Sequence, residues 1–208
     1  AGISKRLCIY EVASVMQLGN AVHCPAMELS TSSKLSSISF NPYVKPVMAS
    51  ATYDGAMQIW DVQKGIETMR LKNHTKRVWS TEFSPIDPTR LLSASDDSTT
   101  RVWSITQKRE CMVINDPNQA NICSVNSSRM DSNLIAVGSA DHKVHVYDLR
   151  NAVKPTLTLE THKKAVSYVK WMGNELVSAS TDSLLRLWDV KGPRGVCLRT
   201  YTGHVNEK

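Results

Sequence analysis

The chain has 208 residues, of which 41% are hydrophobic, 6% aromatic and 21% charged, a balance typical of globular proteins rather than disordered or fibrous ones. No stretch approaches the roughly 20 apolar residues that a membrane-spanning helix needs, so we expect no membrane protein. The net charge is +6, but the basic residues are scattered rather than gathered in a stripe, which argues against nucleic-acid binding.

Four segments share a turn Asp that is followed six positions later by an aromatic residue at the end of an alternating strand. A fainter copy precedes them at 5–11. The four aromatic residues are separated by 43, 44 and 41 positions, which predicts an internal repeat. The four pairs are Asp54 and Trp60, Asp97 and Trp103, Asp141 and Tyr147, and Asp182 and Trp188.

Each unit contains short strands in a constant order. A first strand, which ends in an aromatic residue in most units, is followed by a turn, a strand of small residues, the Asp turn, the alternating strand and a weaker fourth strand. Period-two strands with turn signals every ~8–12 residues predict antiparallel sheets. Examples are the first strands 36–40, 78–83 and 166–171, the small-residue strands 91–95 and 176–180, and the fourth strand 197–201.

This repeat resembles the WD repeat, which forms one four-stranded propeller blade per ~40–45 residues. The pairs at 73–74, 161–162 and 203–204 stand where that family has Gly-His. In such blades the His, a strand Ser, the turn Asp and the Trp form a buried hydrogen-bonded group, so we expect architecture here rather than a catalytic His–Asp pair. The group would contain His74, Asp97 and Trp103 in one unit and His162, Asp182 and Trp188 in another, with Thr31 and Asn118 in the His place of the remaining two.

The resemblance implies an all-β propeller with four complete four-stranded blades and partial blades at both ends. Seven blades of ~43 residues need roughly 300 residues. Because the chain is shorter and opens on Ala1 without a signal-peptide core, we expect a piece of a longer chain. The expected units are 1–30 (partial), 31–72, 73–115, 116–160, 161–202 and 203–208 (the start of the next).

A propeller scaffold does not specify a function, so the functional residues have to be found separately. The residue six positions before the end of each first strand, or three after the signature His, should lie on the rim of the central channel. Residues beside the Asp turn should rise on the same face. The rim residues are Lys34, Arg77, Asn121, Ala165 and Glu207, and the turn neighbours are Tyr53 and His142, with Lys164 adjacent.

Trp79 follows Arg77 by two positions, so both side chains point to one side of the strand. With Tyr53 and Lys34 of the preceding unit they predict an aromatic-walled, basic pocket. Such a pocket suits a short peptide with a proline or aliphatic anchor and acidic residues. Spacing alone supports an alternative equally well. In it, Trp79 is a buried packing residue, and the charged residues are surface residues unrelated to any pocket.

Beyond the WD repeat, the chain resembles the C-terminal propeller of the plant suppressor of phytochrome A proteins, which are relatives of the constitutive photomorphogenic ubiquitin ligase. The resemblance spans essentially the whole chain. It is carried by the segments 1–6, 33–36, 138–142, 147–151, 162–169, 178–183 and 203–208.

The propeller of that family binds Val-Pro peptide motifs flanked by acidic residues. Two departures from the family put the affinity for such peptides in question. The family's Asp-Tyr-Glu-Gly turn is Thr-Tyr-Asp-Gly at 52–55, so Thr52 stands in place of the first Asp, and Ser127 replaces a strand aromatic residue. The resemblance implies a peptide site formed by Lys34, Tyr53, Arg77, Trp79, His142, Lys164 and Glu207.

The tetrapeptide from Tyr147 through Asp148 to Arg150 resembles a second motif, aromatic-Asp-x-Arg. WD proteins use that motif to dock on the damaged-DNA-binding adaptor of cullin-type ubiquitin ligases. Arg150 should project from the face opposite the peptide site. In the other interpretation, Arg150 pairs with its local Asp148.

No nucleophile-elbow, HExxH, P-loop or dinucleotide-binding pattern appears, so we expect no enzyme and no cofactor. Five widely spaced cysteines without a CxxC pair favour neither a disulfide framework nor a zinc site, and indicate the nucleus or the cytosol. The sequence favours a peptide-binding accessory subunit of a cullin-type ubiquitin ligase in light signalling. It would act with the constitutive photomorphogenic ligase and recruit Val-Pro-containing transcription factors or photoreceptors. The alternative is a generic WD-repeat scaffold without a dedicated peptide pocket.

Overall fold

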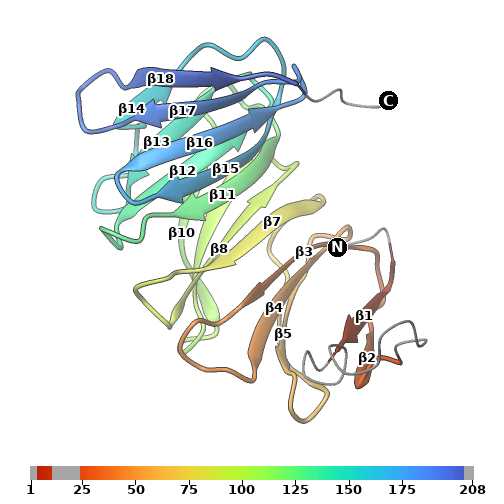
Figure 1. Ribbon diagram of the computed structural model, residues 1–208. Helices are drawn as coiled ribbons and strands as arrows, with labels where there is room; N and C mark the ends of the chain where they lie inside the picture. Colours follow the sequence, from red (N-terminus) through yellow and green to blue (C-terminus); the bar gives the residue numbers. More distant parts are fainter. Residues whose placement is uncertain (1–3, 11–23, 204–208) are drawn as a thin grey trace.

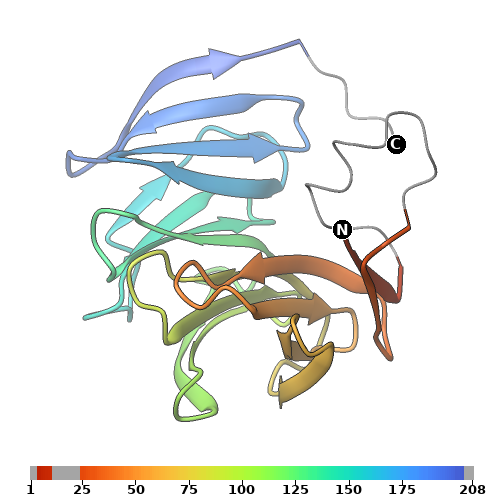
Figure 2. The ribbon, with the colours of Figure 1, turned by 60° about the horizontal axis from the view of Figure 1, so that its bottom comes forward.

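A computed structural model describes residues 4–10 and 24–203, and all regular elements in these ranges are β-strands. Sixteen of the strands form four antiparallel sheets of four strands each, and the other two form a small sheet. The sheets follow one another around an arc (Figure 1), which Figure 2 shows from a second side. In the part of the chain that is described, no helix is long and apolar enough to cross a membrane. The predicted all-β, partial WD-type propeller is therefore confirmed.

Strand order within each complete sheet follows chain order, from the concave side of the arc to its outer side. The small sheet pairs β1 (Arg6–Ile9) with β2 (Met27–Ser30). The complete sheets contain, in turn, β3 (Leu35–Phe40), β4 (Val47–Thr52), β5 (Met57–Asp61) and β6 (Ile66–Leu71); β7 (Val78–Phe83), β8 (Arg90–Ser95), β9 (Thr99–Ser104) and β10 (Arg109–Asn115); β11 (Ile122–Ser127), β12 (Leu134–Ser139), β13 (Val144–Asp148) and β14 (Leu157–Leu159); β15 (Val166–Met172), β16 (Glu175–Ser180), β17 (Leu185–Asp189) and β18 (Val196–Tyr201).

Burial differs between the strands of a sheet. Five of the six residues of β8 are buried, because both of its faces pack against neighbouring sheets. The outer strand β10 alternates between exposed and partly buried residues. Small residues such as Ala94, which is fully buried, let the sheets approach closely. The small-residue strands of the sequence are thus the centres of the sheets.

The Asp turn between the second and third strands has one backbone geometry in all four complete sheets. One residue of each turn has a positive φ, between 65° and 85°. At Gly55 a Cβ atom would lie 2.5 Å from the carbonyl oxygen of His74, so this position has no space for a side chain. The four equivalent residues are Gly55, Ser98, His142 and Ser183.

The predicted buried His–Ser–Asp–Trp group is present in the second sheet. The ring of His74 donates through Nδ1 to Asp97 (2.8 Å) and accepts through Nε2 from Ser93 Oγ (2.7 Å). The indole Nε1 of Trp103 donates to the same Ser93 oxygen (2.8 Å). The single hydroxyl group of Ser93 therefore forms a hydrogen bond with each of the two buried rings. The fourth sheet repeats the arrangement with His162, Asp182, Ser178 and Trp188.

The two sheets without the signature His have different hydrogen bonds at the equivalent positions. In the first, Thr31 donates to backbone carbonyl oxygens instead, while Ser50 still accepts from Trp60 Nε1 (2.9 Å). In the third, the imidazole comes from the strand itself: buried His145 donates through Nε2 to Asp141 (2.9 Å). Asn118 also donates to Asp141, at 2.8 Å.

Neighbouring sheets are joined by apolar clusters and by polar contacts between their innermost strands. A side chain of one innermost strand accepts from a backbone N–H of the next, as Ser39 Oγ does from Phe83 (3.0 Å) and Asn126 Oδ1 from Trp171 (2.7 Å). Glu82 does the same for the backbone N–H of Ser127, at 2.6 Å. Burial raises the pKa of Glu82 above its ordinary value, although these donors favour its ionised form.

Replacing Ser93 with Ala should destabilise the protein more than replacing Ser50 with Ala. The first change leaves two buried ring nitrogens, on His74 and Trp103, without a partner, whereas the second leaves only that of Trp60. We expect losses of about 3 and about 1.5 kcal/mol in the free energy of unfolding, measured by urea denaturation. Equal losses would contradict the shared-hydroxyl arrangement.

The His162 ring should titrate below the ordinary histidine pKa. Its burial lowers its pKa below the ordinary value of 6.5, although the hydrogen bond to Asp182 opposes the shift. Because the folded pKa lies below the unfolded one, this residue contributes stability above about pH 6.5 that is lost as the pH falls through the folded pKa. An NMR titration of the ring nitrogens measures this, and a pKa of 6.5 or higher would contradict it.

Candidate functional site

A recurring backbone hydrogen bond fixes the candidate site residues at one end of the sheets. The residue that precedes each turn Asp donates its N–H to the carbonyl oxygen of the rim residue, which precedes the first strand. The distances are 2.9 to 3.0 Å in all four complete sheets. Rim residue and turn neighbour are therefore held together. The donor–acceptor pairs are Tyr53 and Lys34, Asp96 and Arg77, Ala140 and Asn121, and Thr181 and Ala165.

Three of the predicted site residues are in contact between the first and second sheets. The guanidinium carbon of Arg77 lies 4.3 Å from the centre of the Tyr53 ring and 4.7 Å from that of Trp79. The two rings meet edge to face, with their centres 5.8 Å apart. A cation between two rings in this way gains electrostatic attraction and packing. These three residues, together with Asp96, are called the aromatic corner below.

Asp96 contacts both Trp79 and Arg77 in the aromatic corner. Its Oδ1 accepts a short hydrogen bond of 2.6 Å from Trp79 Nε1, and its Oδ2 lies 3.9 Å from Arg77 Nε. Asp96 was not among the site residues predicted from the sequence. The signal was available, because Asp96 precedes its turn Asp as Tyr53 precedes Asp54. Burial and the charge of Asp96 also raise the pKa of the nearby Cys123 thiol to about 11.

Trp79 is not a core residue. Its ring is only half-buried, whereas the other four tryptophans of the chain are buried. The Arg77 side chain keeps 39% of its surface exposed. The geometry therefore leaves ring and guanidinium surface available for contact, as a binding site requires and a packing role does not.

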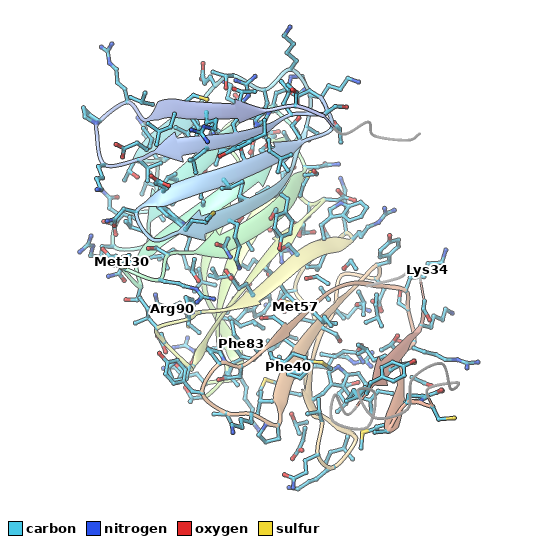
Figure 3. All side chains as sticks on the ribbon, in the orientation of Figure 1. Lys34, Phe40, Met57, Phe83, Arg90 and Met130 are labelled. Carbon is cyan, nitrogen blue, oxygen red and sulfur yellow. The ribbon has the colours of Figure 1, made fainter. Side chains whose placement is uncertain are left out.

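The other predicted site residues that the structure describes are not joined to the aromatic corner by their side chains. Lys34 is exposed at one end of β3, and Figure 3 shows it opposite Phe40 at the other end of that strand. His142 and Lys164 are exposed on the turns and loops of the third and fourth sheets. Among the described residues, none of these three makes a side-chain hydrogen bond or ring contact with the aromatic corner. Glu207 lies outside the described residues.

The two departures from the resembled family have structural roles of their own. The hydroxyl of Thr52 lies 2.5 Å from Asp54 Oδ1 and 2.7 Å from the carbonyl oxygen of Ala56, so it orders the turn that carries Tyr53. Ser127 is buried and receives the Glu82 contact at its backbone N–H. Neither Thr52 nor Ser127 is one of the four residues of the aromatic corner, so both departures leave its side chains in place.

The predicted docking motif lies at the opposite end of the sheets. Asp148 pairs with Leu134 at the end of β13 that is remote from the Asp turn. Arg150 follows with 64% of its side chain exposed, and its Nε and Nη2 bind Asp148 at 2.9 and 2.6 Å. Its Nη2 also lies 3.6 Å from Asp131. Tyr147 is buried and packs in the core. The local Arg–Asp pair considered as the alternative is therefore present, on an exposed guanidinium.

One other polar group has the composition of a metal site. The side chains of Asp116, Asp141 and His145 bring one potential ligand atom each within 4.8 Å of one another. Ser139 Oγ donates to Asp116 (2.8 Å), and both Asn118 and His145 donate to Asp141. These donors make the group a hydrogen-bonded core that replaces the His–Ser–Trp arrangement of the neighbouring sheets.

Comparisons with known proteins agree with the WD-type fold. Residues 65–104, 110–148 and 153–189 match the family WD domain, G-beta repeat. Over its full length the chain is 47% identical to E3 ubiquitin-protein ligase COP1 of Arabidopsis thaliana and covers 30% of that protein. It is 45% identical to Protein SUPPRESSOR OF PHYA-105 1 of the same plant, of which it covers 21%.

A shorter relative is also similar over the whole chain. WD repeat-containing protein RUP2 of Arabidopsis thaliana is 34% identical, and the chain covers 61% of it. The chain spans less than a third of the length of the two longer relatives.

Proposed function

The chain belongs to the WD-repeat family, and on that premise we propose that it is a non-catalytic, peptide-binding module of a ubiquitin ligase. The observation that carries the proposal is the aromatic corner, in which Arg77 lies between Tyr53 and Trp79 at an exposed junction of two sheets. The similarity to proteins named as an E3 ubiquitin-protein ligase and a suppressor of PHYA-105 supports the ligase and light-signalling context.

The peptide class follows from the chemistry of this surface. Half-buried ring faces offer a proline or a valine a large, rigid apolar contact at little conformational cost. The exposed amines of Lys34 and Lys164 lie on the same end of the sheets and attract acidic residues that flank the anchor. The site thus suits a Val-Pro motif with acidic neighbours, carried by transcription factors or photoreceptors in the nucleus.

The opposite face would serve assembly. Arg150 is exposed there, and its guanidinium is pre-oriented by Asp148. In the proposal this residue docks on the damaged-DNA-binding adaptor of a cullin ligase, and the constitutive photomorphogenic ligase is a further partner. Because peptide site and docking residue are at opposite ends of the sheets, one molecule can use both at once.

Replacing Trp79 with Ala should weaken binding of an acidic Val-Pro peptide at least about tenfold, because it removes the larger aromatic wall. Fluorescence anisotropy with a labelled peptide measures the dissociation constant. Tyr43→Ala is the control, since Tyr43 is an exposed aromatic residue in the loop at the opposite end of β3. Equal binding by the Trp79→Ala variant and the parent would rule out this site, and a generic scaffold predicts no binding to either.

Replacing Arg150 with Ala should reduce capture of the adaptor in a pull-down, because the guanidinium would supply charge-assisted hydrogen bonds to it. Lys191→Ala is the matched control, because Lys191 occupies the equivalent position after Asp189 in the fourth sheet. Undiminished capture by the Arg150→Ala variant would leave the local pair with Asp148 as the only role of this residue.

A further inference from the structure

Trp79 and Arg77 of the aromatic corner both contact a single carboxylate, that of Asp96. Among the four residues that precede a turn Asp, only Asp96 is charged; the others are Tyr53, Ala140 and Thr181. The side chain of Asp96 is 19% exposed, so its interactions are only partly screened by water. It contacts Trp79 and Arg77 through different oxygens.

The hydrogen bond from Trp79 fixes the orientation of the indole. An indole attached through two rotatable bonds can present a face or an edge to solvent, and only one orientation places its Nε1 at 2.6 Å from Asp96 Oδ1. A hydrogen bond from a neutral donor to a carboxylate at this distance is among the stronger kinds in proteins. The ring face that a peptide would meet is therefore set by Asp96.

Asp96 also determines what Arg77 does. Its backbone N–H binds the carbonyl oxygen of Arg77 at 2.9 Å, and its Oδ2 lies 3.9 Å from Nε. The guanidinium is thereby kept over the two rings, and its charge is partly compensated. Lys34, whose carbonyl oxygen accepts from the backbone N–H of Tyr53 at 2.9 Å, is exposed and has no such side-chain partner among the described residues, so its charge is uncompensated.

We propose that Asp96 is the positioning residue of the peptide site: it orients the indole of Trp79 and commits Arg77 to ring stacking, so that acidic peptide residues are read by Lys34. This inference rests on the proposed peptide-binding function. Asp96 acts through its neighbours and contacts no peptide atom itself. It follows that its acceptor oxygen matters more for affinity than its charge.

Two substitutions of Asp96 separate the acceptor from the charge. Asp96→Ala removes both, and we expect peptide affinity to fall about tenfold, the lower range for losing a hydrogen bond to a charged group. Asp96→Asn keeps an oxygen that can accept from Trp79 Nε1, and we expect affinity within about threefold of the parent. Glu160→Gln is the control, because it removes an exposed negative charge at the same end of the sheets without touching the aromatic corner.

A measurement without peptide tests the positioning itself. The indole N–H signal of Trp79 in a nitrogen-15 NMR spectrum, assigned by its loss in Trp79→Phe, should persist in Asp96→Asn and shift or broaden in Asp96→Ala. Circular dichroism melting of the same variants shows whether the fold is intact. An unchanged indole signal in a folded Asp96→Ala variant would overturn the proposal.

The assignment of acidic-residue recognition to Lys34 is tested by the salt dependence of binding. Raising the salt concentration should weaken binding by the parent, and Lys34→Gln should remove more of this salt dependence than Arg77→Gln. The reverse order, or parent-like affinity of Asp96→Ala, would overturn the proposal. If the parent does not bind the peptide, the proposed function fails, and the indole signal still decides whether Asp96 orients Trp79.

Discussion

The sheets of this protein cannot bury their apolar faces alone, and everything else in the structure depends on that constraint. Each large apolar cluster is shared by two neighbouring sheets; Leu92 of the second and Ile135 of the third belong to one of them. Contacts such as Ser39 to Phe83 set the register between sheets. The aromatic corner exists only because of this stacking, since Tyr53 comes from one sheet and Trp79 from the next.

The repeat made the fold predictable in detail. A turn Asp and an aromatic residue six positions later fixed the third strand, and the signature His at 74 and 162 located the buried hydrogen-bonded group. These predictions succeeded because the residues act within one unit, where sequence distance determines spatial distance. The contact of Tyr53 with Arg77 and Trp79 crosses between units, yet it could be anticipated because the units repeat in register.

Other features could not be derived from the repeat. Asp96 occupies the repeat position of Tyr53, so the repeat places it beside the rim, but nothing in the pattern indicates that its carboxylate contacts Trp79 and Arg77. The third sheet lacks the signature His, and nothing in the motif indicates that His145 supplies the imidazole from the strand. In both cases the function of the residue is defined by a side-chain partner that only the folded geometry identifies. For Arg150 the sequence left two interpretations open, docking or a local pair, and the folded geometry shows that the pair with Asp148 is present.

The strand-borne imidazole of the third sheet has a consequence for the order of assembly. His145 is four residues from its carboxylate partner, whereas His74 is 23 residues from Asp97. Loop-closure entropy scales with the logarithm of this separation, so the shorter connection costs about 1.5 kcal/mol less to close. The His145–Asp141 contact of the third sheet can therefore form inside the β12–β13 hairpin, before Asp116 and Asn118 join it. That hairpin is a local starting point onto which the sheets on either side can condense during folding.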